Sequence, residues 1–329
     1  MLIFVLSKQV TMCKTNIKQI RDFDSFYDLI TYFDTEQKCQ QHLADLRWNG
    51  QPVCPYCQSD RVNELKGKTK RYKCYGCRKQ FGIRVGTIFH DSKLPLRKWF
   101  IAIFIFSAHK KGISSHQLSR DLKITQKTAW FVLHRIREIY KQEKPSFTKP
   151  VEMDETYVGG KESNKHKNKK TEGTQGRSTK TKTPVIGIVE RTEKGKTKVY
   201  ALKVAKTDGA TIKSIVEGAV EKGGKIYTDE WKSYNVLNSD YDREFVCHSV
   251  GEYVNGKAHT NNVENFWSHL KRGIFGIYHH VSEKHLDAYV NEFSFRYNTR
   301  DLSDGSRFDL TLANGQKRLT YKELIGKTA

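Results

Sequence analysis

The sequence lacks a hydrophobic run long enough to cross a membrane. A membrane-spanning helix needs about 20 consecutive apolar residues. The most apolar stretch, Phe100 to Ala108, is short and is flanked by Lys98 and Lys110. The apolar start, Met1 to Leu6, has no basic region before it and is too short for the core of a signal peptide. We therefore expect a soluble, cytoplasmic protein.

Cysteines are few, and acidic residues are scarce relative to basic ones. Seven cysteines, four of them in two close pairs, fit metal binding in a reducing compartment better than a disulfide framework. Lys and Arg outnumber Asp and Glu by 58 to 36, which gives a net charge of +22. So large an excess attracts a polyanion, and nucleic acid is the first candidate, with a generally basic protein as the alternative. No internal repeat is evident, and 329 residues allow two or three domains.

The two cysteine pairs predict a zinc ribbon over residues 51–92. They are Cys54 with Cys57 and Cys74 with Cys77, a spacing by which two tight turns present four thiolates at the corners of a tetrahedron. Four protein ligands leave no position for water, so the zinc would be structural. Basic and aromatic residues around the pairs suit contact with a phosphate backbone. Two alternatives remain open: a ribbon that contacts only protein, and four cysteines paired as disulfides.

A helix-turn-helix DNA-binding domain is predicted over residues 93–145, after an N-terminal helical segment (residues 1–50). Ser114 to Leu122 can form a capped helix, Lys123-Ile124 a turn, and Thr125 to Trp130 the start of a second helix. The exposed start of that second helix would read base edges, and two arginines further along it could grip phosphates. The readers are Gln126, Lys127 and Thr128, and the arginines are Arg135 and Arg137. An ordinary helical hairpin with a solvated basic face is the alternative.

Residues 150–305 alternate between strand and helix patterns, with a C-terminal tail (306–329) after them. Strands are expected at 151–158, 184–189, 199–204, 225–228 and 245–248, and helices at 209–221, 262–274 and 283–297. This order predicts an α/β fold with a mixed, ribonuclease H-like sheet, in which the first and fourth strands are neighbours. Residues 159–183 form a polar loop, and its lysine-rich part (161–182) is either a mobile insertion or a clamp on DNA.

Three acidic residues fall where such a sheet would bring them together. Asp154 lies on the first strand, Asp229 ends the fourth strand, and Glu264 is near the start of a late helix. Carboxylates are the hard ligands that Mg²⁺ prefers, and two such ions roughly 3.5–4 Å apart can activate an attacking oxygen and stabilise a leaving oxygen at a phosphodiester. Lys271 lies within about 20° of Glu264 around the helix and would bind phosphate, and Arg272 extends that basic edge. Each acid alone would more often be a solvated or capping group.

At these residues the chain resembles the DDE transposases of bacterial insertion sequences, in the zinc-ribbon group related to Merlin elements. The resemblance covers nearly the whole chain. It rests on Arg47-Trp48 and the two cysteine pairs, Thr128-Ala129-Trp130 with Arg135-Ile136-Arg137, Asp154 to Lys161, Thr228-Asp229-Glu230, His259-Thr260-Asn261 through Lys271-Arg272-Gly273, Tyr278-His279-His280, and Phe295 to Asn298.

This resemblance implies a ribonuclease H-like catalytic domain, dependence on Mg²⁺ or Mn²⁺, recognition of terminal inverted repeats, and strand transfer into target DNA. It implies Asp154, Asp229 and Glu264 as the catalytic triad. Subgroups of the family differ in the third metal ligand, so Asn261 is the alternative to Glu264. Pairing of two DNA ends implies a homodimer or larger assembly in the DNA complex, associated with the bacterial nucleoid.

Three other functions remain open from the sequence. A non-catalytic DNA-binding regulator would keep the zinc ribbon and the helix-turn-helix and carry a degenerate nuclease domain. A resolvase or nuclease of the same fold would cut DNA without joining it. A zinc protein of RNA processing or the ribosome would show no preference for a DNA end over structured RNA.

Overall fold

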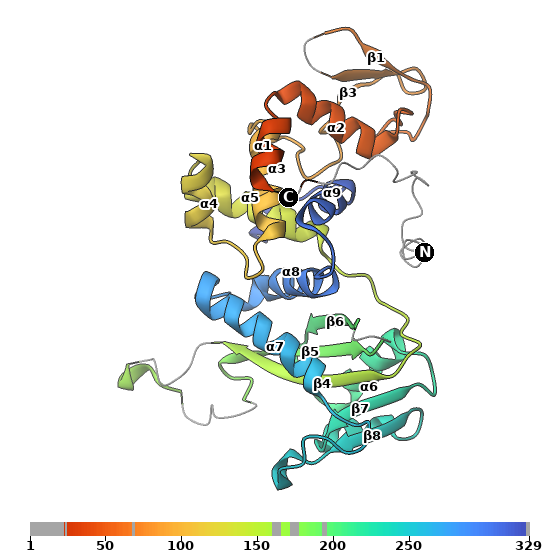
Figure 1. The fold of residues 1–329 in the computed structure, drawn as a ribbon, viewed down its shortest axis with the longest axis vertical. Helices are drawn as coiled ribbons and strands as arrows, with labels where there is room; N and C mark the ends of the chain where they lie inside the picture. Colours follow the sequence, from red (N-terminus) through yellow and green to blue (C-terminus); the bar gives the residue numbers. More distant parts are fainter. Residues whose placement is uncertain are drawn as a thin grey trace. The chain divides into compact units, whose positions relative to one another are not determined.

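The computed structural model describes residues 23, 25–67, 70–159, 166–171, 178–192 and 196–326. Their contacts group them into two compact units (Figure 1). The first contains the described residues up to 109, residues 115–139, and residues 302–326. The second contains residues 110–114 and 140–301. The apolar start Met1 to Leu6 and residues 161–165 and 172–177 of the lysine-rich part lie outside the described residues. None of the described helices is long and apolar enough to cross a membrane.

The first unit combines helices with a small antiparallel sheet of order β1-β2-β3. Several of its helices have side-chain N-caps. Ser25 and Thr35, for example, each accept a hydrogen bond from a backbone N–H in the first turn of the helix that follows. The elements are α1 (Phe26–Tyr32), α2 (Glu36–Trp48), β1 (Val62–Leu65), β2 (Arg71–Cys74), β3 (Gln80–Gly82), α3 (Leu96–Ala108), α4 (Ser115–Leu122), α5 (Gln126–Ile139), α9 (Asp304–Ala313) and α10 (Tyr321–Leu324).

The last part of the chain is not the tail expected for residues 306–329. Helix α9 packs on α3, and its Phe308 is completely buried among the rings of Phe23, Phe33 and Phe100. All three partners of Phe308 lie more than two hundred residues earlier, so no local pattern in the sequence could reveal them. The tail prediction is wrong because a long-range aromatic cluster holds this segment in the first unit.

Helices α4 and α5 form the expected pair, and Lys123 takes the left-handed backbone conformation in the turn between them (φ 49°). At the start of α5, Gln126 and Lys127 are exposed. Arg135 and Arg137, in contrast, are only 6% and 1% exposed. Arg135 donates to two backbone carbonyls, and the guanidinium of Arg137 lies over the ring of Phe106. The prediction that these two arginines grip phosphates is therefore wrong, because both support the core of their own unit.

The second unit is built on a mixed sheet of order β6-β5-β4-β7-β8. The first three strands are antiparallel to one another, whereas β7 runs parallel to β4 and to β8, so the predicted pairing of the first and fourth strands is confirmed. The strands are β4 (Val151–Gly159), β5 (Lys182–Glu190), β6 (Lys198–Lys203), β7 (Lys225–Asp229) and β8 (Asp242–Val246). Strand β8 begins earlier than predicted, at Asp242, which is the register partner of Lys225 on β7.

Helices cover both faces of this sheet (Figure 1). Helix α6 (Gly209–Ala219) packs on one face, against Val151 and Met153 of β4. Helices α7 (Asn261–Gly273) and α8 (Leu286–Asn298) pack on the other. The remaining helical segments are η2 (Lys167–Lys169), η4 (Lys232–Leu237), η5 (His248–Val250), the π-helical η6 (Ile274–Tyr278) and η7 (Glu283–His285). Side chains alternate along a strand, so Glu152 and Asp154 lie on the face of β4 opposite to Val151 and Met153 and face α7.

Candidate functional site

The four predicted zinc ligands lie together in the first unit. One ligand atom from each of Cys54, Cys57, Cys74 and Cys77 falls within 4.8 Å of all the others. All four are free thiols, which argues against the disulfide alternative. The backbone N–H of Cys77 is the main cause that lowers the pKa of Cys74 to about 6, so a thiolate forms readily there. Four gathered thiols fit a structural Zn²⁺ with no open coordination position.

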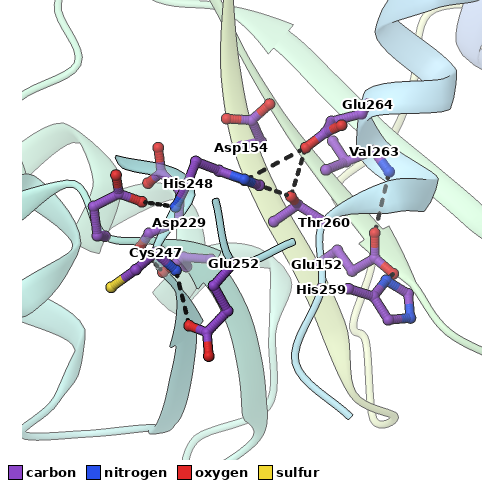
Figure 2. A network of polar contacts seen from close by, with 12 residues as sticks. Glu152, Asp154, Asp229, Cys247, His248, Glu252, His259, Thr260, Val263 and Glu264 are labelled. Atoms are coloured by element: carbon purple, nitrogen blue, oxygen red, sulfur yellow. Dashed lines mark hydrogen bonds and ion pairs between the residues drawn. The ribbon is translucent and has the colours of Figure 1, made fainter. Parts of the chain in front are cut away.

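The second unit brings the three predicted carboxylates to one pocket. Parallel pairing of Val151 with Ile226 sets a register that places Asp154 level with Asp229 on the neighbouring strand. Glu264 lies in the first turn of α7. Figure 2 shows the three side chains around a common space, which is an open pocket of about 440 Å³. Lys271 lines the same pocket, as expected from its position on the same face of the helix as Glu264.

The carboxylates share the pocket without closing around a single point. Among the described residues, only the four cysteines form a group of three or more potential ligands whose donor atoms all lie within 4.8 Å of one another. Two ions at one phosphodiester are themselves roughly 3.5–4 Å apart, so ligands of different ions are spread more widely than ligands of one ion. The arrangement is compatible with carboxylates shared between two ions and not with one ion held by all three as they stand.

Negative charge accumulates around Asp154. Burial, followed by the neighbouring carboxylates of Glu155 and Asp229, raises the pKa of Asp154 to about 8. The indole Nε1 of Trp267 donates to Asp154 Oδ2 at 3.0 Å and partly offsets this effect. A divalent cation would favour the ionised form of such a carboxyl. The three carboxylates offer the oxygen ligands that Mg²⁺ or Mn²⁺ prefers.

A glycine makes room for the tryptophan that supports Asp154. Gly187 of β5 is the register partner of Asp154. A Cβ atom at Gly187 would come within 2.6 Å of the Trp267 ring. No local pattern in the sequence indicates that the N–H of Trp267 reaches a carboxylate.

Glu152, which sequence reasoning missed, ties the β4 strand to the start of α7. Its completely buried carboxylate accepts from the backbone N–H of Asn262 at 2.8 Å and from that of Val263 at 3.2 Å. Figure 2 shows the bond from Val263. Arg191 donates to the same carboxylate at 2.6 Å, and His259 Nδ1 lies 3.3 Å from it. Burial lowers the pKa of His259 although Glu152 lies beside it. The strand that carries Asp154 therefore also fixes the helix that carries Glu264.

His248 is the histidine that lines the pocket, whereas His259, His279, His280 and His285 do not. Its Nε2 lies 3.6 Å from Glu264 Oε1, and Thr260 Oγ1 donates to the same oxygen at 2.7 Å (Figure 2). His248 follows β8 at a position with no motif that could mark it in the sequence. Asn261, the alternative third ligand, is also absent from the pocket lining.

Comparison with known protein families identifies two segments of the chain. Residues 147–298 match the ISXO2-like transposase domain, and residues 34–80 match the transposase zinc-ribbon domain. An uncharacterized protein in the transposable element ISH50 of Halobacterium salinarum is 30% identical over 277 residues, which are 81% of this chain and 92% of that protein. An uncharacterized transposase-like protein of Haemophilus influenzae is 29% identical over 108 residues, or 32% of this chain and 86% of that protein. The chain therefore belongs to the family of transposases that carry an ISXO2-like transposase domain and a transposase zinc ribbon.

Proposed function

We propose that this protein is a DDE transposase that cuts DNA at the terminal inverted repeats of an insertion sequence and joins the ends to target DNA. The observation that carries the proposal is the convergence of Asp154, Asp229 and Glu264 on one pocket of the second unit, beside Lys271. The parallel pairing of β4 with β7 and the crossing of α7 over the same face support a ribonuclease H-like arrangement.

In this proposal the three carboxylates hold two Mg²⁺ or Mn²⁺ ions, which when bound supply activation of the attacking oxygen and stabilisation of the leaving oxygen. Asp154 and Asp229 present their oxygens from adjacent strands, and Glu264 presents its own from α7. Trp267 orients Asp154 by its hydrogen bond, and Glu152 fixes the start of α7. Lys271 contributes a cation for the phosphate on the same side of the helix.

The zinc ribbon and the α4–α5 pair would hold the ends of the element. Gln126 and Lys127 are exposed at the start of α5, where a recognition helix reads base edges. Thr128 is partly exposed and its hydroxyl lies 2.8 Å from that of Thr125. Arg272, at the other end of α7, is exposed and adds positive charge beside the pocket. Binding of two ends would require at least two copies of the chain in the DNA complex.

The test is cleavage and strand transfer with DNA that carries the element's own ends. We expect the wild-type protein to nick labelled ends and join them to a plasmid when Mg²⁺ or Mn²⁺ is present. Asp154→Asn should lower the rate at least about a hundredfold and leave end binding unchanged, because it removes a metal ligand and not a DNA-binding surface. Asp242→Asn, at an exposed carboxylate of β8, is the matched control and should retain full activity.

Each alternative function predicts a different result in the same assay. A non-catalytic regulator would bind the ends without metal-dependent nicking. A resolvase or nuclease would nick the ends without joining them to the plasmid. An RNA-directed zinc protein would bind structured RNA as well as it binds the DNA end. Loss of end binding by Asp154→Asn with cleavage retained would contradict the residue assignment.

A further inference from the structure

The loop between β8 and α7 (residues 247–260, the β8–α7 loop) is firmly held at both ends. Glu230, which directly follows β7, accepts from the backbone N–H groups of His248 and Ser249 at 2.9 and 3.0 Å. Near the other end, Arg191 donates to the carbonyl of Lys257 at 2.6 Å. A loop tied by its backbone in this way presents its outward side chains from a defined position.

The inner side of this loop is already used for packing. Ala258 is buried against Tyr227 and Val246 of the sheet. Asn255 and Ala258 exchange two backbone hydrogen bonds of 2.9 and 2.8 Å, which close the turn before α7. The backbone of the loop and Ala258 therefore hold its inner side against the sheet.

The outer side of the loop exposes three large apolar side chains. Val250 is 78% exposed, Tyr253 is 63% exposed and Val254 is 54% exposed. Single exposed apolar residues are common on proteins, whereas three within five positions of one loop form a candidate contact surface. Lys257, also exposed, adds a positive charge to the same loop.

This surface adjoins the candidate active site. The ring of Tyr253 lies 5.2 Å from the ring of His248, centroid to centroid. His248 in turn lines the pocket with Asp229 and Glu264, and Figure 2 shows it between these two carboxylates. A nucleotide whose phosphate occupied the pocket would therefore have its base within reach of an exposed aromatic face.

We propose that Tyr253, flanked by Val250 and Val254, stacks on an unpaired nucleobase next to the phosphodiester that is cut. The inference rests on the proposed function, since it requires DNA in the pocket. Stacking on an aromatic side chain offsets the free-energy cost of unstacking a base, and it tolerates any sequence. Three side chains offer far less than the roughly 800 Å² per partner of a stable protein interface, so a base fits this surface better than a second copy of the chain.

The proposal is tested by a double-mutant cycle between the side chain and the base. Binding is measured by fluorescence anisotropy with duplexes copied from the element's end, in Ca²⁺ to limit cleavage. In one series each nucleotide next to the cut is replaced in turn by an abasic residue. For the wild-type protein we expect one replacement to weaken binding about fivefold to a hundredfold, the range that stacking of one base gives. For Tyr253→Ala the same replacement should have no further effect.

Two control variants separate stacking from a structural effect. Tyr253→Phe keeps the aromatic face and should keep the coupling, whereas Tyr27→Ala, at an exposed tyrosine of α1, should leave it unchanged. Equal weakening of intact and abasic duplexes by Tyr253→Ala would overturn the proposal. So would a loss of self-association by Tyr253→Ala without any coupling, because the surface would then join two copies. Wild-type cleavage of the same duplex is followed in parallel, so that failure of the proposed function is recognised separately.

Discussion

The raised pKa of Asp154 links the proposed metal site to the stability of the protein. This pKa of about 8 lies far above the ordinary value of 3.8, mainly because of burial and then because of Glu155 and Asp229. Between these two pH values the metal-free folded protein holds a proton that the unfolded chain has released. Its free energy of unfolding therefore falls as the pH rises through this window. A divalent cation bound by the carboxylates would offset this electrostatic destabilisation.

The isosteric change Asp154→Asn should consequently stabilise the metal-free protein at alkaline pH. At pH 8 we expect the variant to unfold at a higher temperature than the wild type, and at the acidic end of the window the two should converge. Mg²⁺ or Mn²⁺ should raise the unfolding temperature of the wild type and have little effect on the variant. Differential scanning calorimetry across the window measures both effects. A wild-type stability that is flat with pH, or equal stabilisation of the two proteins by metal, would contradict the prediction.

The residues that sequence reasoning could and could not find differ in the kind of evidence they need. Asp154, Asp229 and Glu264 could be placed because strand ends and helix starts have local patterns that fix their approximate positions. Glu152 and His248 could not be found in this way. The importance of Glu152 depends on backbone N–H groups more than a hundred residues away, and that of His248 on Glu264 across the pocket. The prediction that Arg135 and Arg137 contact phosphates is wrong because the sequence does not show whether an arginine side chain is exposed or buried.

At the scale of elements, helix α7 depends on its attachment to β4. Glu152→Ala would remove the acceptor of two backbone N–H groups at the start of α7 and leave Arg191 without its carboxylate. Loss of one partner of a buried ion pair costs about 3–5 kcal/mol, so we expect the free energy of unfolding to fall by about 3 kcal/mol. Glu217→Ala on α6, an exposed glutamate, should change it by less than about 0.5 kcal/mol. Urea denaturation compares them, and similar effects of the two changes would refute this role.

The contact between β5 and α7 makes a second prediction at this scale. A methyl group at Gly187 would displace the Trp267 ring, because the two would approach within 2.6 Å. We expect Gly187→Ala to lower the stability by about 1–3 kcal/mol, as overpacking of a core does. It should also weaken the hydrogen bond from Trp267 to Asp154, which a change in tryptophan fluorescence with pH would report. Gly276→Ala, where an added Cβ meets nothing, is the control.

The order of strands and the main helices of the second unit could be predicted because each element carries its own apolar periodicity. The sheet needed only the pairing of the first and fourth strands to bring Asp154 beside Asp229. The return of α9 to the first unit could not be predicted. The aromatic partners of Phe308 lie in the first third of the sequence, and an amphipathic pattern does not say which surface the helix covers.

The whole molecule carries a net charge of +22, and this charge should dominate its binding to DNA. Each cation that contacts a phosphate releases counterions, so the association constant falls with salt at a slope set by the number of such contacts. The exposed Lys127 and the buried Arg135 carry the same formal charge and lie on the same helix. They differ in whether a phosphate can reach them.

Lys127→Ala should therefore reduce the salt slope by about one unit, because one phosphate contact is lost. Arg135→Met should leave the slope unchanged even where it lowers the stability of the first unit, since that guanidinium is occupied by the carbonyls of Ile88 and Leu319. Titrations by fluorescence anisotropy at several salt concentrations give both slopes, and circular dichroism verifies that each variant is folded. A reduced slope for Arg135→Met, or an unchanged one for Lys127→Ala, would place the DNA on a different face of α5 from the one proposed.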